Sequence, residues 1–271
     1  MSDGGEKRQE FDPSMPNEAR MLDYLMGGKD NFAADREAAD AVRTVAPELP
    51  MMIREGRAFL GRAVRYLAEQ GVRQFVDIGC GLPTRGSVHE VLEPIAPGSI
   101  VVYVDHDPVV IAHSRAIVSE HKTITCIQAD ARDPGTILTH PDLTAVIDLS
   151  RPTAIILHAI VTVISVDQEA AAVVDRVVEA LAPGSFLLFS HAICDPAPEV
   201  TERLVRLFTD EKVLENTRKN VRTLAEVSRF LDGLDLVEPG LVPLPAWHPP
   251  SNGPDVDPGT FWAVGAIARK R

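Results

Sequence analysis

This chain of 271 residues has few cysteines and no pattern that would use them structurally. Cys80, Cys126 and Cys194 are odd in number and far apart, and no two have the CxxC spacing of zinc and redox motifs. The eight histidines form neither HExxH nor another metal-binding spacing. We therefore expect no disulfide framework, no metal and a reducing compartment, the cytoplasm.

The sequence also lacks long apolar runs and an excess of basic residues. No run reaches membrane-spanning length, and the first residues contain no apolar signal segment, so we expect no membrane contact. With 27 Lys and Arg against 39 Asp and Glu, the net charge is -12. This balance disfavours nucleic acid as a partner, because binding a phosphate backbone needs clustered cations. The oligomeric state is not readable from the sequence.

Helical patterns dominate the part of the chain that precedes the first clear strand. Residues 1–15 are polar and predict a flexible arm. Apolar residues at helical spacing, with glycine or proline stops, then predict three helices. We expect these helices from Asn17 to the Gly27-Gly28 stop, over 34–45 and over 51–69. The chain is therefore divided into the arm (1–15), a helical cap on a sheet (16–70) and an α/β domain (71–271).

The most informative stretch of the sequence runs from Phe75 to Thr84. Its first four residues predict a buried parallel strand, which Gly79 and Gly81 follow. Without Cβ atoms, these glycines can take positive φ and let the backbone approach a ligand. Asp77 would lie at the edge where open α/β sheets bind their ligands. Taken alone, an ordinary strand-to-helix turn explains the glycines equally well.

Strands and helices alternate after this stretch, as in a parallel sheet. Asp107 and Pro108 predict a helix start, with the aspartate as N-cap, and Ser165-x-x-Gln168 predicts a capping box. Two tail strands joined by a Pro- and Gly-rich segment predict an antiparallel edge. The expected strands are 75–78, 100–104, 123–128, 154–159, 185–190, 234–242 and 261–268, and the expected helices are 108–119, 166–181, 198–208 and 223–231.

Acidic residues follow the second and third of these strands. Asp105 can accept hydrogen bonds from both hydroxyls of a ribose, a position that dinucleotide enzymes also use. Asp130, with Ala131 beside it, follows the third strand and can contact a ligand at the same edge. A solvated acid at a strand end explains Asp130 equally well.

These features resemble the class I S-adenosylmethionine-dependent methyltransferases. The last predicted strand, with 261–265 (FWAVG), also resembles that class. A narrower match is carried by the segments 17–20 (NEAR), 23–31 (DYLMGGKDN), 77–84 (DIGCGLPT), 103–108 (YVDHDP), 230–234 (FLDGL) and 238–242 (EPGLV). In these segments the chain resembles the actinobacterial S-adenosyl methyltransferase family long carried as a domain of unknown function.

The resemblance covers nearly the whole chain and implies both a fold and a cofactor. The fold is Rossmann-like α/β, with a mostly parallel sheet and an antiparallel C-terminal edge strand. The cofactor is S-adenosyl-L-methionine, while the acceptor stays unidentified. The residues that the resemblance assigns to the cofactor are Asp77, Gly79, Gly81, Asp105, His106, Asp130 and Ala131.

The segment from Tyr24 to Asn31 carries more polar groups than a helix stop needs. It is not a phosphate loop, because Asp30 replaces the hydroxyl residue of GxxxxGK[ST]. We expect it to fold over the cofactor as a lid, and the alternative is a glycine-stopped surface helix. The side chains expected to face inward are Arg20, Tyr24, Lys29 and Asn31, of which Tyr24 and Asn31 are predicted to contact the cofactor.

His158 ends an otherwise apolar strand. In this fold the end of the fourth strand faces the transferred methyl, so His158 can orient or deprotonate an acceptor near neutral pH. A hydrogen-bonded core imidazole is the alternative. His191, after the fifth strand, is a weaker candidate, and His89 is better explained by a helix.

Three functions follow from these features. The first is methyl transfer to oxygen, nitrogen or carbon of a small molecule, which needs alignment and exclusion of water more than a catalytic triad. The Asn/Asp-Pro-Pro-aromatic motif of nucleic-acid amino methylases is missing after the fourth strand, and residues 247–250 (WHPP) lie too late to replace it. The second is a non-catalytic S-adenosylmethionine-binding sensor or partner protein. The third, a dinucleotide dehydrogenase, is weakened by Pro83 and Thr84 where a third glycine would fall.

Overall fold

Strand β1 (Gln74–Ile78) lies inside a mixed sheet, between β2 and β4. The computed structural model describes residues 12–83, 86–119, 121–210, 221–250 and 257–271. These residues form an eight-stranded sheet in the order β3-β2-β1-β4-β5-β8-β6, with β7 also paired to β8. The other strands are β2 (Ile100–Asp105), β3 (Ile124–Gln128), β4 (Ala154–His158), β5 (Phe186–Ala192), β6 (Asp235–Leu236), β7 (Val242–Pro243) and β8 (Ala263–Arg269).

The direction of the strands confirms the predicted fold class. Strands β1 to β5 pair in parallel, whereas β8 runs antiparallel to β5 and also pairs antiparallel with β6 and β7. Because parallel strands end at the same edge, the segments that follow β1, β2, β3, β4 and β5 all meet at one side of the molecule. A ligand site built from those segments is therefore confined to this carboxyl edge.

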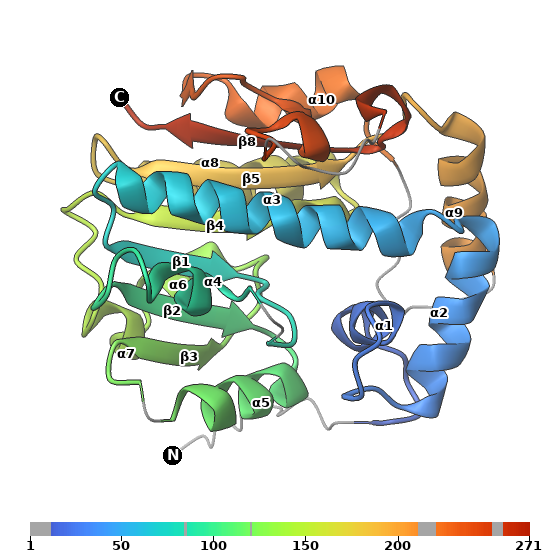
Figure 1. Ribbon diagram of the computed structural model, residues 1–271, viewed down its shortest axis with the longest axis horizontal. Coiled ribbons are helices and arrows are strands. Elements are labelled where there is room, and N and C mark those ends of the chain that lie inside the picture. Colours follow the sequence, from blue (N-terminus) through green and yellow to red (C-terminus); the bar gives the residue numbers. More distant parts are fainter. Residues whose placement is uncertain (1–11, 84–85, 120, 211–220, 251–256) are drawn as a thin grey trace, which may run out of the picture.

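Helices cover both faces of the sheet and its carboxyl edge (Figure 1). Helix α3 crosses one face and α8 lies on the other, while α1, α2 and α9 group on the side toward which the parallel strands point. The helices are α1 (Glu18–Leu25), α2 (Ala33–Val45), α3 (Leu49–Glu69), α4 (Val88–Leu92), α5 (Pro108–Val118), α6 (Pro134–Leu138), α7 (Pro141–Thr144), α8 (Asp167–Ala180), α9 (Pro198–Asp210) and α10 (Leu224–Ser228). Short 3-10 helices are η1 (Ile160–Val163), η2 (Arg229–Leu231), η3 (Leu244–Ala246) and η4 (Pro258–Thr260).

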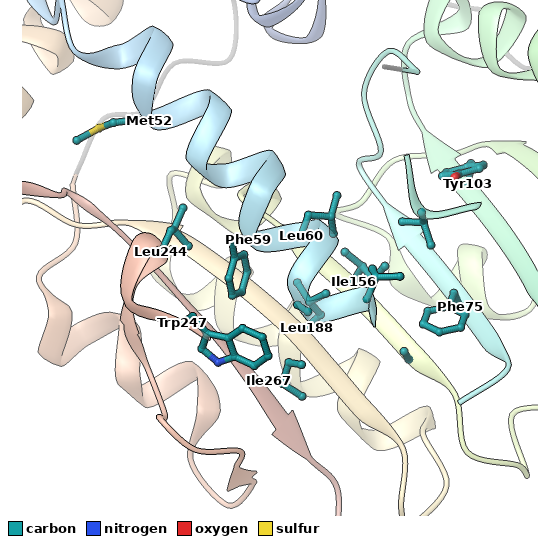
Figure 2. Packing of buried hydrophobic residues seen from close by; sticks show 14 of the residues in the cluster. Met52, Phe59, Leu60, Phe75, Tyr103, Ile156, Leu188, Leu244, Trp247 and Ile267 are labelled. Carbon is teal, nitrogen blue, oxygen red and sulfur yellow. The ribbon is translucent and has the colours of Figure 1, made fainter. Parts of the chain in front are cut away.

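The buried face of α3 packs directly on the sheet. Phe59 and Leu60 point from the helix toward Ile156, Leu188 and the Trp247 side chain (Figure 2). Each such side chain contributes about 1.5–3 kcal/mol when it is fully buried. Successive strand residues alternate between this layer and a second one, in which Val76 and Ile155 meet α8, as the period of two requires. Helix α3 thus belongs to the core of the sheet, and the division into a helical cap and an α/β domain stays a prediction.

The structure corrects two predicted boundaries. The strand expected over 234–242 is split into β6 and β7, because Pro239 has no N–H for a ladder and Gly240 takes φ +86. The capping box at Ser165 is also wrong: α8 begins after Val166, which makes no side-chain cap hydrogen bond. Most of the predicted flexible arm, residues 1–11, lies outside the described residues.

Within the described ranges, no helix is both long and apolar enough to cross a membrane. The same ranges hold no group of three or more His, Cys, Asp or Glu side chains arranged to bind a metal ion.

The contact between α3 and β8 generates a stability prediction at Gly265. A Cβ on this residue would lie 2.5 Å from Phe59 Cζ and 2.7 Å from Leu244 Cδ2. Gly265→Ala is therefore expected to lower the free energy of unfolding in urea by about 1–3 kcal/mol. Gly61→Ala is the control, because its nearest neighbour is Val91 at 3.9 Å and alanine favours a helix by about 0.5–1 kcal/mol. Equal stability of the two variants would contradict this packing.

Candidate functional site

The turn after β1 favours glycine at two positions, through backbone conformation at Gly81 and through both conformation and lack of space at Gly79. Gly79 and Gly81 have φ of +76 and +65, which confirms the predicted positive φ. A Cβ on Gly79 would lie 2.6 Å from Cδ1 of Ile160 in η1. The Gly79 N–H donates to Val104 O at 2.8 Å, which fixes the turn against β2. The backbone is therefore held open at the carboxyl edge.

Asp105, the last residue of β2, is fixed by two backbone amides. Its Oδ2 accepts from Gly81 N and its Oδ1 from Asp107 N, both at 3.0 Å, and the residue is 6% exposed. Burial raises the pKa of Asp105, while these two hydrogen bonds oppose the rise. Each oxygen keeps a lone pair, so the carboxylate can still accept from two hydroxyl groups. His106 lies next to it, with Nδ1 3.5 Å from Asp105 Oδ1 and a half-exposed side chain.

Asp77 is a buried carboxyl that makes no hydrogen bond to a described residue. It is 4% exposed and lines a hollow together with Gly81 and Arg57. Burial raises the pKa of Asp77 to about 7, against the opposing charge of Arg57 and with a smaller contribution from Asp105. A cationic group placed in this hollow would restore the charged form, so Asp77 is suited to bind an ammonium.

Arg57 is the residue of this site that the sequence did not reveal. It comes from α3, and its Nη2 lies 3.8 Å from the position of a Cβ on Gly81. The half-buried guanidinium forms no hydrogen bond or ion pair with any residue in the described ranges. In the sequence, Arg57 is marked only by its position between Gly56 and Phe59 on the apolar face of the helix. An arginine beside such a face is partly removed from solvent.

The end of β3 completes the row of three carboxyl groups at this edge. Ala129 N donates to Asp105 O at 2.9 Å, so Asp130 and the half-buried Ala131 follow directly beside the end of β2. The Asp130 carboxylate is 41% exposed and is bound by Arg132, whose Nε lies 3.0 Å from both oxygens. Burial raises the pKa of Asp130, but the hydrogen bonds and charge of Arg132 outweigh that effect and lower it.

His158 at the end of β4 is held as a neutral imidazole. Its Nδ1 lies 2.7 Å from Ser190 Oγ, which also accepts from Ala159 N at 2.9 Å. Burial, with a smaller contribution from the charge of Arg57, lowers the pKa of His158 to about 3. A group with this pKa is a poor base at neutral pH, so of the two predicted roles only orientation of an acceptor suits the geometry. On the helix side, Gly56 leaves room for the ring, since a Cβ there would lie 3.3 Å from Nε2.

The two other histidines considered for the site, His191 and His89, form hydrogen bonds within the protein. His191 is 2% exposed, with Nε2 3.1 Å from Arg222 Nη1 and Nδ1 bonded to Ala192 O. His89 lies in α4, as expected for a helical residue, and its Nδ1 is 2.7 Å from Tyr103 Oη. Neither imidazole needs a ligand to satisfy it.

The glycine-rich segment after α1 wraps around the carboxylate of Asp23. Oδ2 of this residue accepts from Asp30 N at 2.9 Å and from Asn31 Nδ2 at 2.8 Å, and a Cβ on Gly28 would overlap the carboxylate. Tyr24 Oη lies 3.4 Å from an oxygen of Asp40. The polar atoms of Tyr24 and Asn31 thus have partners within 16–70, and their contact with the cofactor stays a prediction. Lys29 is exposed, and its inward orientation also stays a prediction.

Arg20 joins α1 to α2 and to the carboxyl edge. Its Nε lies 2.9 Å from Asp35 Oδ2 and its Nη1 3.0 Å from Asp107 Oδ2, with all three side chains buried. Asp107 also accepts from Val109 N at 2.7 Å, which confirms it as the N-cap of α5. Since Asp107 N donates to Asp105, one chain of polar contacts runs from α2 to the glycine turn.

Comparison with known proteins agrees with this geometry. A family model described as S-adenosyl methyltransferase matches residues 4–271. A solved DUF574 family protein from Streptomyces avermitilis is 38% identical, with a TM-score of 0.89 over 96% of this chain and 99% of that one. A structure from Thermobifida fusca, named as a candidate methyltransferase, is also 38% identical, with a TM-score of 0.86 over 95% and 96% of the two chains. Among curated proteins, none matches.

The raised pKa of Asp77 predicts a stability gain on neutralisation. Because the folded-state pKa of about 7 exceeds the unfolded value, the stability that protonation of Asp77 contributes is present at acid pH and is lost as pH rises through 7. Asp77→Asn is therefore expected to raise the free energy of unfolding at pH 8 by about 2–4 kcal/mol, and by less at pH 5.

Urea unfolding at pH 5 and pH 8 measures this difference. Glu37→Gln, an exposed change on α2, serves as the control and should show no pH-dependent gain. A gain for Asp77→Asn that does not grow between the two pH values would show that the carboxyl is ionised like an ordinary aspartate.

Proposed function

We propose that this protein is an active methyltransferase. The chain belongs to the S-adenosyl methyltransferase family, whose cofactor is S-adenosyl-L-methionine. The bound cofactor supplies a methyl group that its sulfonium already activates. The protein then has to hold both ligands in line and exclude water. The proposed acceptor is a small molecule.

The observation that carries this proposal is the pair of buried carboxyl groups on either side of the glycine turn. Asp105, fixed by two amides, would accept from the ribose hydroxyls, and the unpaired Asp77 would accept from the ammonium group of the methionine portion. Gly79 and Gly81 leave room for the chain between these two ends. An amino-acid group at one end and a nucleoside at the other is the composition of S-adenosylmethionine, so the residues present fit the cofactor.

The adenine side of the proposed site is more open. His106 and Ala131 follow the ends of β2 and β3 and would flank the base, and Asp130 would accept from its amino group. Asp130 already pairs with Arg132, so it would have to share its oxygens between the two partners. We therefore assign Asp130 a smaller contribution to affinity than Asp105.

The acceptor side is proposed at the ends of β4 and β5. His158 would orient the acceptor through its neutral imidazole. A second hollow at this edge is lined largely by apolar side chains, and its histidine and arginine already have protein partners. This lining supports a small, largely apolar acceptor. The apolar lining residues around the end of β5, in α9 and just before β8 are Ala192, Ile193, Leu204, Val205, Phe208 and Trp262.

Titration calorimetry with S-adenosylmethionine, S-adenosylhomocysteine and NAD tests the assignment of the cofactor. We expect the first two to bind and NAD not to bind. Asp105→Asn should weaken S-adenosylhomocysteine binding about 10- to 100-fold, because one charged acceptor is lost. Asp130→Asn is the matched control and should weaken binding less. A larger loss for Asp130→Asn would reverse the roles of the two acids.

His158 tests the acceptor side. Incubation with methyl-labelled S-adenosylmethionine and a pool of metabolites should label a small molecule, which then serves as substrate. His158→Ala is expected to lower kcat about 10- to 100-fold while S-adenosylhomocysteine affinity is unchanged. Because the pKa of His158 is about 3, the wild-type rate should show no His158 ionisation between pH 6 and pH 8. A rate that follows a group of pKa 6.5 and loses this dependence in the variant would make His158 the base instead.

A further inference from the structure

We propose that Arg57 of helix α3 binds the α-carboxylate of the cofactor, so that it forms a clamp for an amino-acid zwitterion together with Asp77. This inference rests on the proposed function, because it assumes that the hollow beside the glycine turn receives the methionine portion. It extends the site to a residue outside the strands and turns of the sheet.

The guanidinium of Arg57 lies over the glycine turn. Its Nη2 is 3.8 Å from the position of a Cβ on Gly81, and the Cβ of Ala19 in α1 is 4.0 Å from the same point. Arg57 and Asp77 line one hollow, although they are not close enough to form an ion pair. Two opposite charges therefore face the same small volume without neutralising each other.

Arg57 differs from the other arginines that the fold buries or half-buries. Arg20 pairs with two aspartates, Arg62 donates to Leu244 O and Trp247 O, and Arg222 binds Asp167 and two backbone carbonyls. Within the described ranges Arg57 alone of these four has no hydrogen-bond partner. A guanidinium has five donors, and leaving them unsatisfied in a hollow is costly, so an anion is the expected occupant.

The chemistry of the occupant follows from the pair. A free α-amino acid carries an ammonium and a carboxylate on the same carbon atom, so it presents both charges within a few ångströms. The planar fork of an arginine matches the two oxygens of a carboxylate, and the Asp77 carboxylate matches the ammonium. A carboxylate on the acceptor would satisfy Arg57 alone and would leave Asp77 unexplained. The methionine portion satisfies both residues.

The position of α3 makes this contact stable. Arg62, on the same helix, anchors the segment of Leu244 to Trp247 at 2.7–2.9 Å, and Phe59 packs against the sheet. The backbone that carries Arg57 is therefore held by the core of the protein. A rigid support reduces the entropy that the side chain must lose when it binds its ligand.

Calorimetry with two ligands that differ only at the amino-acid end tests the inference. S-adenosylhomocysteine carries this end, whereas 5′-methylthioadenosine lacks it and keeps the nucleoside. Arg57→Gln is expected to weaken S-adenosylhomocysteine binding about 10- to 100-fold and to leave 5′-methylthioadenosine binding unchanged. Arg57→Lys should recover part of the loss. Arg54→Gln, an exposed change on the same helix, is the matched control and should affect neither ligand.

Each contrary result has a distinct meaning. Equal weakening of both ligands by Arg57→Gln would assign Arg57 to the support of the turn and overturn the inference. Unchanged S-adenosylhomocysteine affinity would also overturn it, and a raised KM for the acceptor in that variant would move the carboxylate to the acceptor. If the wild-type protein bound neither ligand, the proposed function would fail together with the inference. Thermal unfolding of each variant shows that any loss of binding is not a loss of fold.

Discussion

The arrangement of this site depends on the carboxylate of Asp105. Its two oxygens accept from the amides of Gly81 and Asp107, and so they join the turn after β1 to the start of α5. Burial alone would favour the neutral form of this group, and the two amide donors work against that tendency. The glycine turn, the ribose acceptor and the N-cap of α5 are therefore one connected structure. A change in any of them alters the geometry of the other two.

Much of the fold was predictable because it depends on local patterns. The apolar run before Gly79 required a buried strand, Pro108 fixed a helix start, and the alternation of elements required a parallel sheet. Local patterns failed where two of them competed. At Ser165 a capping pattern was present, but the helix began after Val166 instead. At Pro239 the apolar run continued while the missing N–H prevented pairing.

The site was predictable only in part, because some of its residues come from elements whose relative positions the sequence pattern does not show. Asp77, Asp105 and Asp130 follow strands, and topology alone brings strand ends together. Arg57 reaches the same place from a helix that crosses the sheet, and no spacing in the sequence encodes that crossing. The pKa of His158 likewise depends on burial and on Arg57, neither of which a single residue type reveals. Side chains that gather at the ends of parallel strands can thus be predicted from the sequence. Electrostatic interactions between a helix and the sheet that it covers become visible only in the structure.

The buried contacts among Asp35, Arg20 and Asp107 determine which part of this protein can be separated as an independently folding unit. A shortened version that started at β1 would leave the Asp107 carboxylate without its guanidinium, in surroundings evolved to exclude water. A chimera that transplanted only the sheet would inherit the same defect at the start of α5. Protein engineers who wish to exchange acceptor preference between relatives should therefore move α1, α2 and the β2–α5 junction together, as a single block.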